Sequence, residues 1–207
     1  MAGPDPIKID SDRLLLCEGK TIKLVLGPLC RHFEIQGFQP LDFGSKDNFR
    51  NFLEDVSLLP GFAEKVKTVA IIRDAETNAA AMFKSTCEAL SSFGLPFPRA
   101  PGEITDGPPA VGIFIVPDNK ADGMIETLCL RSVDNDPAFP CLDQFFECVK
   151  GRLKELPSNM HKARAQTFLA TRKEVDYHVG RAADNGVWPF DHEAFAEVRD
   201  FLAKLAN

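Results

Sequence analysis

Short apolar runs that alternate with helix-like segments constrain the fold of this chain more than any other feature. The runs at residues 12–17, 66–73 and 111–116 are each bounded by polar or turn-forming residues. Such runs are typical of buried strands in a parallel sheet, and the stretches between them carry apolar residues at helical spacing. Strands that alternate with helices indicate an α/β fold. We therefore expect a central, mostly parallel sheet flanked by helices.

The remaining elements extend this alternation. A further strand is expected within 33–43, and helices are expected from Thr21, after a Ser45 cap, over 78–93 and from near Gly123. The proline-rich stretch between Leu95 and Ala110 predicts an ordered surface loop with room for one short edge strand.

The last third of the chain predicts helices. From Leu142 onward, apolar residues fall on three helical stripes, the last of them after an Asp191 cap, and we expect this extension, 142–207, to cover the sheet. The stripes comprise Leu142, Phe145, Phe146, Val149 and Leu153; Met160, Ala163, Thr167 and Phe168; and Phe195, Val198, Leu202 and Leu205.

Length and composition set broader limits. A chain of 207 residues with 44% hydrophobic content is expected to form one domain, 1–207, preceded by a polar tail over 1–11. Its net charge of −6 argues against a protein that coats nucleic acid through bulk electrostatics, although a local basic groove is compatible with it. The chain shows no leader and no apolar run of about 20 residues, so we expect a cytoplasmic protein without membrane contact.

The residues that commonly bind zinc show no metal-binding pattern. The six cysteines contain no CxxC pair and mostly fall in apolar stretches, where a small buried side chain is expected. The four histidines lack ligand spacing, which disfavours zinc. Trp188 is expected to be a packing anchor rather than a platform for stacking bases.

Carboxylates follow the predicted strands. Glu18 comes after the first strand, Asp74 and Glu76 come after the strand at 66–73, and Asp122 and Glu126 follow the strand at 111–116. Ligands of parallel sheets collect beyond the carboxyl ends of the strands. Carboxylates that converge there would repel one another and raise their own pKa values unless a cation shares them, which indicates a divalent metal, with Mg²⁺ as the first candidate.

Each of these residues also has a purely structural interpretation. Glu18, Asp74 and Asp122 could interact with or cap the helix that follows, and Glu76 could be solvated. Asp118 with Asn119 is typical of a turn. Lys162 could be a solvated lysine rather than a phosphate contact.

The acids at the strand ends, taken with Asp122-x-x-x-Glu126, resemble the Toprim arrangement of topoisomerases, primases and overcoming-lysogenization-defect nucleases. Over most of its length the chain is similar to the Toprim-like family DUF3226. The similarity extends from Leu14-Leu15-Leu16-Cys17-Glu18-Gly19-Lys20 through Val116-Pro117-Asp118-Asn119 to the helical end with Trp188.

The resemblance implies roles for these residues. Glu18 would be the general acid or base, and Asp74 with Glu76 would hold Mg²⁺ or Mn²⁺. Asp122 and Glu126 would lie one helical turn apart and face the same metal. Lys162 would meet transition-state charge, with Lys20 and Lys23 as further basic candidates.

The implied function is metal-dependent, nuclease-like chemistry on the phosphodiesters of nucleic acid, for which two ions about 3.5–4 Å apart would be suitable. The alternative is a non-catalytic Toprim-like module that binds a nucleotide, nucleic acid or a protein partner. Two departures bear on the choice. Asp74-Ala75-Glu76 stands where Asp-x-Asp is usual, and Thr21-Ile22 follows a motif that commonly includes another acid.

Overall fold

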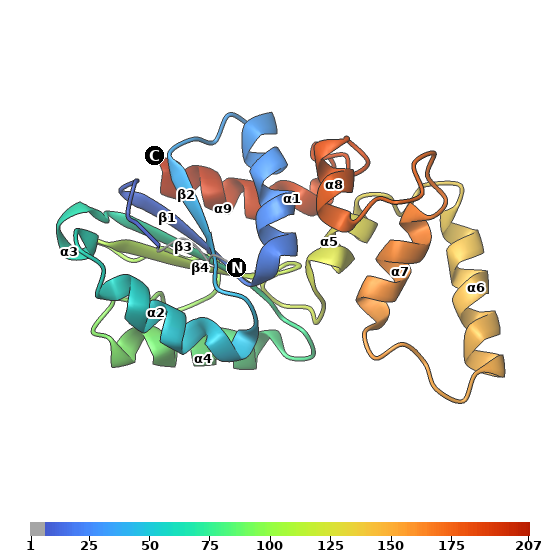
Figure 1. The fold of residues 1–207 in the computed structure, drawn as a ribbon, viewed down its shortest axis with the longest axis horizontal. Coiled ribbons are helices and arrows are strands. Elements are labelled where there is room, and N and C mark those ends of the chain that lie inside the picture. Colours follow the sequence, from blue (N-terminus) through green and yellow to red (C-terminus); the bar gives the residue numbers. More distant parts are fainter. Residues whose placement is uncertain (1–6) are drawn as a thin grey trace, which may run out of the picture.

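The computed structural model describes residues 7–207, and its centre is a parallel β-sheet (Figure 1). The strands of this described part are β1 (Arg13–Cys17), β2 (Phe38–Asp42), β3 (Thr68–Asp74) and β4 (Ala110–Val116), in the order β2-β1-β3-β4. The predicted α/β class is therefore confirmed. Residues 1–6 of the predicted tail lie outside the described residues, and in the remainder of that tail Ile9 is buried.

Helices connect the strands and form the end of the chain. In order they are α1 (Gly19–His32), the 3₁₀ turn η1 (Lys46–Asn48), α2 (Phe49–Ser57), α3 (Phe62–Lys65), α4 (Ala79–Ser92), α5 (Ile125–Arg131), α6 (Phe139–Arg152), α7 (Met160–Leu169), α8 (Val179–Asp184), the 3₁₀ turn η2 (Glu193–Phe195) and α9 (Ala196–Ala206). Within residues 7–207, none of the helices has the length and apolar character needed to span a lipid bilayer.

The sheet is covered on both faces, as its continuous apolar strands require. Alternate strand residues point to opposite faces. Leu15, Ala70 and Phe114 pack into the core under α1, α5, α8 and α9. Leu16 and Ile71 pack into the core under α2, α3 and α4. Figure 1 shows the sheet between these two layers, with its carboxyl edge facing α5 and α7.

The helical end of the chain divides into two parts. α9 crosses β4 at close range, and a Cβ at Gly112 would lie 2.7 Å from the ring of Phe201. α6 and α7 instead pack on each other beyond the sheet, and α7 contacts α5 (Figure 1). Within residues 142–207, α9 is therefore the main helix that covers the sheet. α7 lies instead near the carboxyl edge of the sheet.

The structure narrows two predicted boundaries and corrects one predicted helix cap. The strand within 33–43 is only β2, because the chain leaves α1 through Glu34 at φ 55° and Gly37 at φ 88°. The predicted helix near Gly123 begins at Ile125, two residues later. Asp191 does not cap the last helix, since its side chain lies 3.0 Å from Nε2 of His32.

Burial tests the remaining predictions about single side chains. Phe145 and Leu153 are exposed rather than part of a buried stripe, because α6 is packed on one side only. Trp188 is a packing anchor as predicted: its indole N–H donates to the carbonyl of Val179 at 2.9 Å and its ring stacks on Phe168. The six cysteines are free thiols; Cys17 and Cys129 are buried, Cys30 and Cys87 partly buried, and Cys141 and Cys148 exposed.

Candidate functional site

A pocket of about 320 Å³ opens at the carboxyl edge of the sheet, where the chain leaves all four strands. It brings together five of the predicted site residues, and Asp122, Lys20 and Lys23 are not among its lining. The lining consists of Glu18, Gly19, Thr21, Gly44, Ser45, Lys46, Asp47, Asp74, Glu76, Met124, Ile125, Glu126 and Lys162.

Glu18 occupies the first position beyond β1. Its backbone N–H donates to the carbonyl of Ile72 at 3.0 Å, which extends the β1–β3 ladder by one bond. The next residue, Gly19, has φ 77°, a left-handed conformation that glycine adopts without a steric penalty. The Glu18-Gly19 pair thus turns the chain sharply from strand into helix while holding the carboxylate at the sheet edge.

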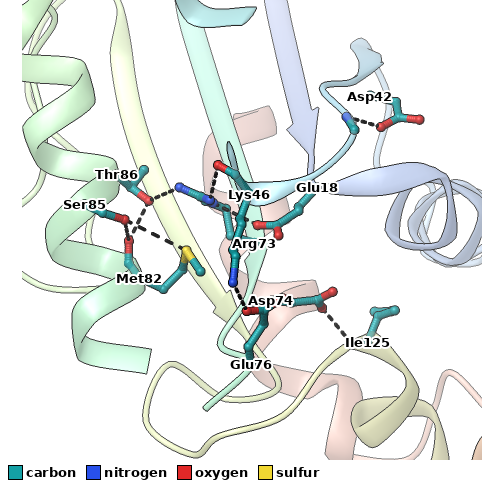
Figure 2. A network of polar contacts seen from close by, with 11 residues as sticks. Glu18, Asp42, Lys46, Arg73, Asp74, Glu76, Met82, Ser85, Thr86 and Ile125 are labelled. Atoms are coloured by element: carbon teal, nitrogen blue, oxygen red, sulfur yellow. Dashed lines mark hydrogen bonds and ion pairs between the residues drawn. The ribbon is translucent and has the colours of Figure 1, made fainter. Parts of the chain in front are cut away.

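The Glu18 carboxylate forms a buried ion pair. Nε of Arg73 donates to its Oε2 at 2.9 Å, and the two side chains are only 3% and 8% exposed (Figure 2). Burial raises the pKa of Glu18 above its ordinary value, although the Arg73 guanidinium opposes that shift. The pair fixes one oxygen of Glu18.

Asp74 ends β3 with its side chain on the opposite face from Arg73. Its Oδ1 accepts the backbone N–H of Ile125 at 2.8 Å (Figure 2). Burial raises the pKa of Asp74 well above its ordinary value, and the nearby carboxylates of Glu126 and Glu18 raise it further. Asp74, Glu126 and Glu18 therefore lie close enough in one pocket for their charges to repel one another, as expected from their positions at the strand ends.

Backbone hydrogen bonds fix the position of Glu76, whose side chain is only partly buried. It has φ 52°, and it exchanges two backbone hydrogen bonds of 2.8 Å with Gly123. Its Oε2 accepts from Nζ of Lys46 at 2.9 Å, in a pair whose side chains are 36% and 51% exposed. An exposed pair of this kind is weak and easily exchanged.

Glu126 is buried with one of its two carboxylate oxygens unpartnered. It lies in the first turn of α5, is 3% exposed, and its Oε2 has no hydrogen-bond partner among the described residues. Burial raises the pKa of Glu126, whereas nearby Lys162 and His161 lower it. An unsatisfied buried carboxylate oxygen is costly, so Glu126 is the pocket residue that would gain most from a cation or a proton.

Asp122 does not share a helical turn with Glu126. The bridge to Glu76 keeps Gly123 extended and α5 starts only at Ile125, so Asp122 precedes the helix and is exposed. The expectation that Asp122 and Glu126 lie one helical turn apart on the same helix was therefore wrong. Asp118 acts as a turn former, with Oδ1 accepting from the backbone N–H groups of Lys120 and Ala121.

Lys162 reaches the pocket from α7. Its backbone N–H bonds to the side chain of Asn159, which caps the helix, and the lysine itself is exposed. It lines the same cavity as Asp74 and Glu126 and lowers the pKa of both. The sequence suggested both a solvated lysine and a phosphate contact, and its exposed place in the pocket is compatible with either.

Arg73 and Lys46 were not predicted as site residues. A signal for Arg73 was present, because a charged residue at the end of an otherwise apolar central strand is expensive to bury unless it is paired. The carboxylate that pairs with it, Glu18, directly follows the neighbouring strand of the sheet. Lys46 carried no comparable signal, since it lies in an exposed 3₁₀ turn.

The donor set is chemically suited to a hard cation. Across residues 7–207, no three His, Cys, Asp or Glu side chains are arranged to hold a metal ion as they stand. The pocket nonetheless contains two buried carboxylates, Asp74 and Glu126, that form no ion pair in the described part of the chain. Carboxylate oxygens without nitrogen or sulfur donors favour Mg²⁺ or Mn²⁺ over zinc.

Comparisons with known proteins place the chain in a family. No curated protein matches it. A solved structure, the C-terminal region of the Xanthomonas campestris pv. campestris OLD protein, is 12% identical with a TM-score of 0.48, and the match covers 96% of this chain and 97% of that one. The family model described as "Protein of unknown function (DUF3226)" matches residues 12–207. The chain therefore belongs to the DUF3226 family, as the motif residues had indicated.

Proposed function

We propose that this pocket binds a divalent cation, Mg²⁺ or Mn²⁺, and acts on phosphodiesters. One observation carries the proposal: Oε2 of Glu126 is buried without a hydrogen-bond partner in the cavity that also holds the buried Asp74. A divalent cation would satisfy this oxygen and offset both the burial and the carboxylate repulsion that raise the pKa of Asp74.

Asp74 and Glu126 would hold the cation, and Glu76 would supply a third carboxylate. The ion pair of Glu76 with Lys46 is exposed, so exchanging it for a metal contact costs little. Asp122 does not belong to the proposed ligand set, because it is not among the residues that line the pocket.

The other pocket residues would carry the proton and charge chemistry. Glu18 keeps one oxygen free of the Arg73 contact, and burial raises its pKa above the ordinary value, which suits a group that gives and takes a proton. Lys162 would contact the oxygens of the phosphoryl group, where negative charge grows in the transition state. A bound divalent cation would act as a Lewis acid at the same group.

Nucleic acid is the proposed substrate class. The support is the resemblance of Glu18, Asp74 with Glu76, and Asp122-x-x-x-Glu126 to the motifs of Toprim enzymes. Ser45 and Lys46 also line the pocket. The chain has a net charge of −6, so binding would be local to this edge and not spread over the surface.

Cleavage of labelled single- and double-stranded DNA and RNA in Mn²⁺ or Mg²⁺ tests the proposal. We expect Glu18→Gln and Asp74→Asn to reduce cleavage by about a hundredfold or more. Lys162→Ala should also reduce it, whereas Lys120→Ala, which removes an exposed lysine outside the pocket, should not. Activity that is equal in wild type and Asp74→Asn would come from a contaminant and would contradict the proposal.

A specific observation also favours a second candidate, a non-catalytic binding module. Glu18 and Glu76 already have cationic partners in Arg73 and Lys46, so much of the pocket is ordered without a metal. Such a module would bind a nucleotide, nucleic acid or a protein partner, and in the first two cases Lys46 and Lys162 would provide the phosphate contacts. Binding of an oligonucleotide that persists in EDTA and is lost in Lys46→Ala, without cleavage under any condition, would favour this alternative.

A further inference from the structure

Arg73 is a buried charge that the proposed chemistry does not use. Its three side-chain nitrogens are all engaged: Nε donates to Glu18 at 2.9 Å, Nη1 to Oγ1 of Thr86 at 3.1 Å, and Nη2 to the backbone carbonyl of Lys46 at 3.2 Å. Figure 2 shows the guanidinium between α4 and the Glu18 carboxylate. Each nitrogen of Arg73 therefore already has a partner within the protein, and the side chain is only 3% exposed, so Arg73 is not placed to bind a substrate.

Two aromatic rings hold the guanidinium in place. Its central carbon lies 4.8 Å from the ring centre of Phe49 and 5.6 Å from that of Phe43. An arginine stays protonated in proteins, so this position carries a permanent positive charge. The charge stands beside Glu18, at the edge of the acidic pocket.

The acids of the pocket thus differ in what neutralises them. Glu18 is paired with a buried cation, and detaching it would leave the Arg73 charge buried and unpaired, which is unfavourable. Glu76 is paired with an exposed lysine that can move into water. Asp74 and Glu126 are buried and form no ion pair within the part of the chain that the structure describes.

We propose that Arg73 takes the place of a second metal ion, so that the pocket binds one divalent cation, at Asp74 and Glu126, and holds Glu18 with its own guanidinium. Arg73 is then a positioning residue: it keeps the Glu18 carboxylate oriented and excludes a second cation from it. This inference rests on the proposed function and gives the metal stoichiometry of that site.

The count of bound Mn²⁺ tests the inference on the unmodified protein. Free Mn²⁺ is measured by its electron paramagnetic resonance signal during titration, and bound ions are counted by difference. We expect one ion per chain. A second ion that binds within tenfold of the first, or a spin-coupled pair, would overturn the inference and leave the proposed function standing. Absence of any bound ion at millimolar Mn²⁺ would overturn both.

Variants of the Arg73–Glu18 pair test whether Arg73 sets the number of bound metal ions. Arg73→Gln should raise the number of bound ions from one to two. Arg73→Lys keeps the positive charge and should still bind one ion, like wild type. A folded Arg73→Gln protein that still binds one ion would contradict the proposed exclusion.

If Arg73→Gln does not fold, the double variant Glu18→Gln/Arg73→Met removes both charges together. It should keep one ion with a Kd within threefold of wild type, because neither residue contacts the metal. Loss of the ion in the folded double variant would place Glu18 among the ligands and overturn the inference.

Discussion

The backbone N–H of Ile125 donates a 2.8 Å hydrogen bond to Oδ1 of Asp74, which ties the end of β3 to the first turn of α5. Because Glu126 follows Ile125 in that turn, the same bond keeps a second buried carboxylate near Asp74, and its charge raises the pKa of Asp74. Two acids separated by about fifty residues in sequence are thus held at one place in the pocket.

The raised pKa values of the pocket acids predict a pH dependence of stability for the metal-free protein. Burial raises the pKa of Glu18, Asp74 and Glu126 above the ordinary values of 3.8 for aspartate and 4.5 for glutamate. The native state then binds protons more tightly than the unfolded chain. The stability from these groups is full below the ordinary pKa and falls as the pH rises through the raised one.

A comparison of wild type with Asp74→Asn isolates this effect, since Asp118 and Asp136 have lowered pKa values and act in the opposite direction. The asparagine oxygen still accepts from Ile125 and carries no charge. Denaturant unfolding in EDTA should show the variant to be more stable than wild type at pH 7, with the difference shrinking toward pH 4. A variant less stable than wild type at pH 7 would contradict the proposed repulsion.

The Arg73–Glu18 pair predicts strong coupling in a double-mutant cycle. Arg73→Met alone should lower the free energy of unfolding by about 3–5 kcal/mol, because it leaves a buried carboxylate without its partner. Adding Glu18→Gln should restore much of that loss. Urea unfolding of the two single variants and the double variant measures the coupling, and strictly additive effects would show that the pair is not coupled.

The contact between α1 and α8 predicts a steric limit at Gly180. A Cβ at this position would lie 2.4 Å from Cβ of Leu24, so Gly180→Ala should destabilise the protein by about 1–3 kcal/mol. Gly151→Ala is the matched control: no atom lies within 4 Å of the added Cβ in α6, and helix propensity should give a gain of up to about 1 kcal/mol. Equal effects in thermal unfolding would argue against the close packing.

Thiol reactivity should separate the cysteines by burial. Cys141 and Cys148 are exposed on α6 and should react first with a disulfide reagent. Cys17 and Cys129 should react only on unfolding, because burial raises their pKa values and leaves little thiolate. Mass spectrometry of partly labelled protein identifies the modified residues, and early labelling of Cys17 would contradict the packing of β1.

The sequence predicted the elements that pack the sheet, because apolar runs and helical spacing report burial directly. It also placed Glu18 and Asp74 at the carboxyl edge, since each directly follows or ends a buried strand. The positions of side chains across the pocket depended on tertiary contacts. Asp122 fell outside the pocket because the backbone bridge between Glu76 and Gly123 delays the start of α5.

The ion-pair partners of the pocket residues also could not be predicted from local sequence patterns. Arg73 and Glu18 meet only because β1 and β3 are neighbours in the sheet, although they are 55 residues apart in sequence. The sequence-based estimate of a solvated Lys162 likewise considered its own helix alone, whereas α7 packs against α5 and presents the lysine to the pocket.

Calorimetric titration of Mn²⁺ tests the central claim most directly. Wild type should bind Mn²⁺ in this titration. In a separate unfolding experiment, Mg²⁺ at a hundred times its Kd should raise the free energy of unfolding by about 2.7 kcal/mol. Asp74→Asn and Glu126→Gln should weaken binding tenfold or more, whereas Asp122→Asn, an exposed acid outside the pocket, should bind like wild type. Absence of binding to wild type at millimolar Mn²⁺, or equal affinity in Asp74→Asn, would contradict a metal site at this edge of the sheet.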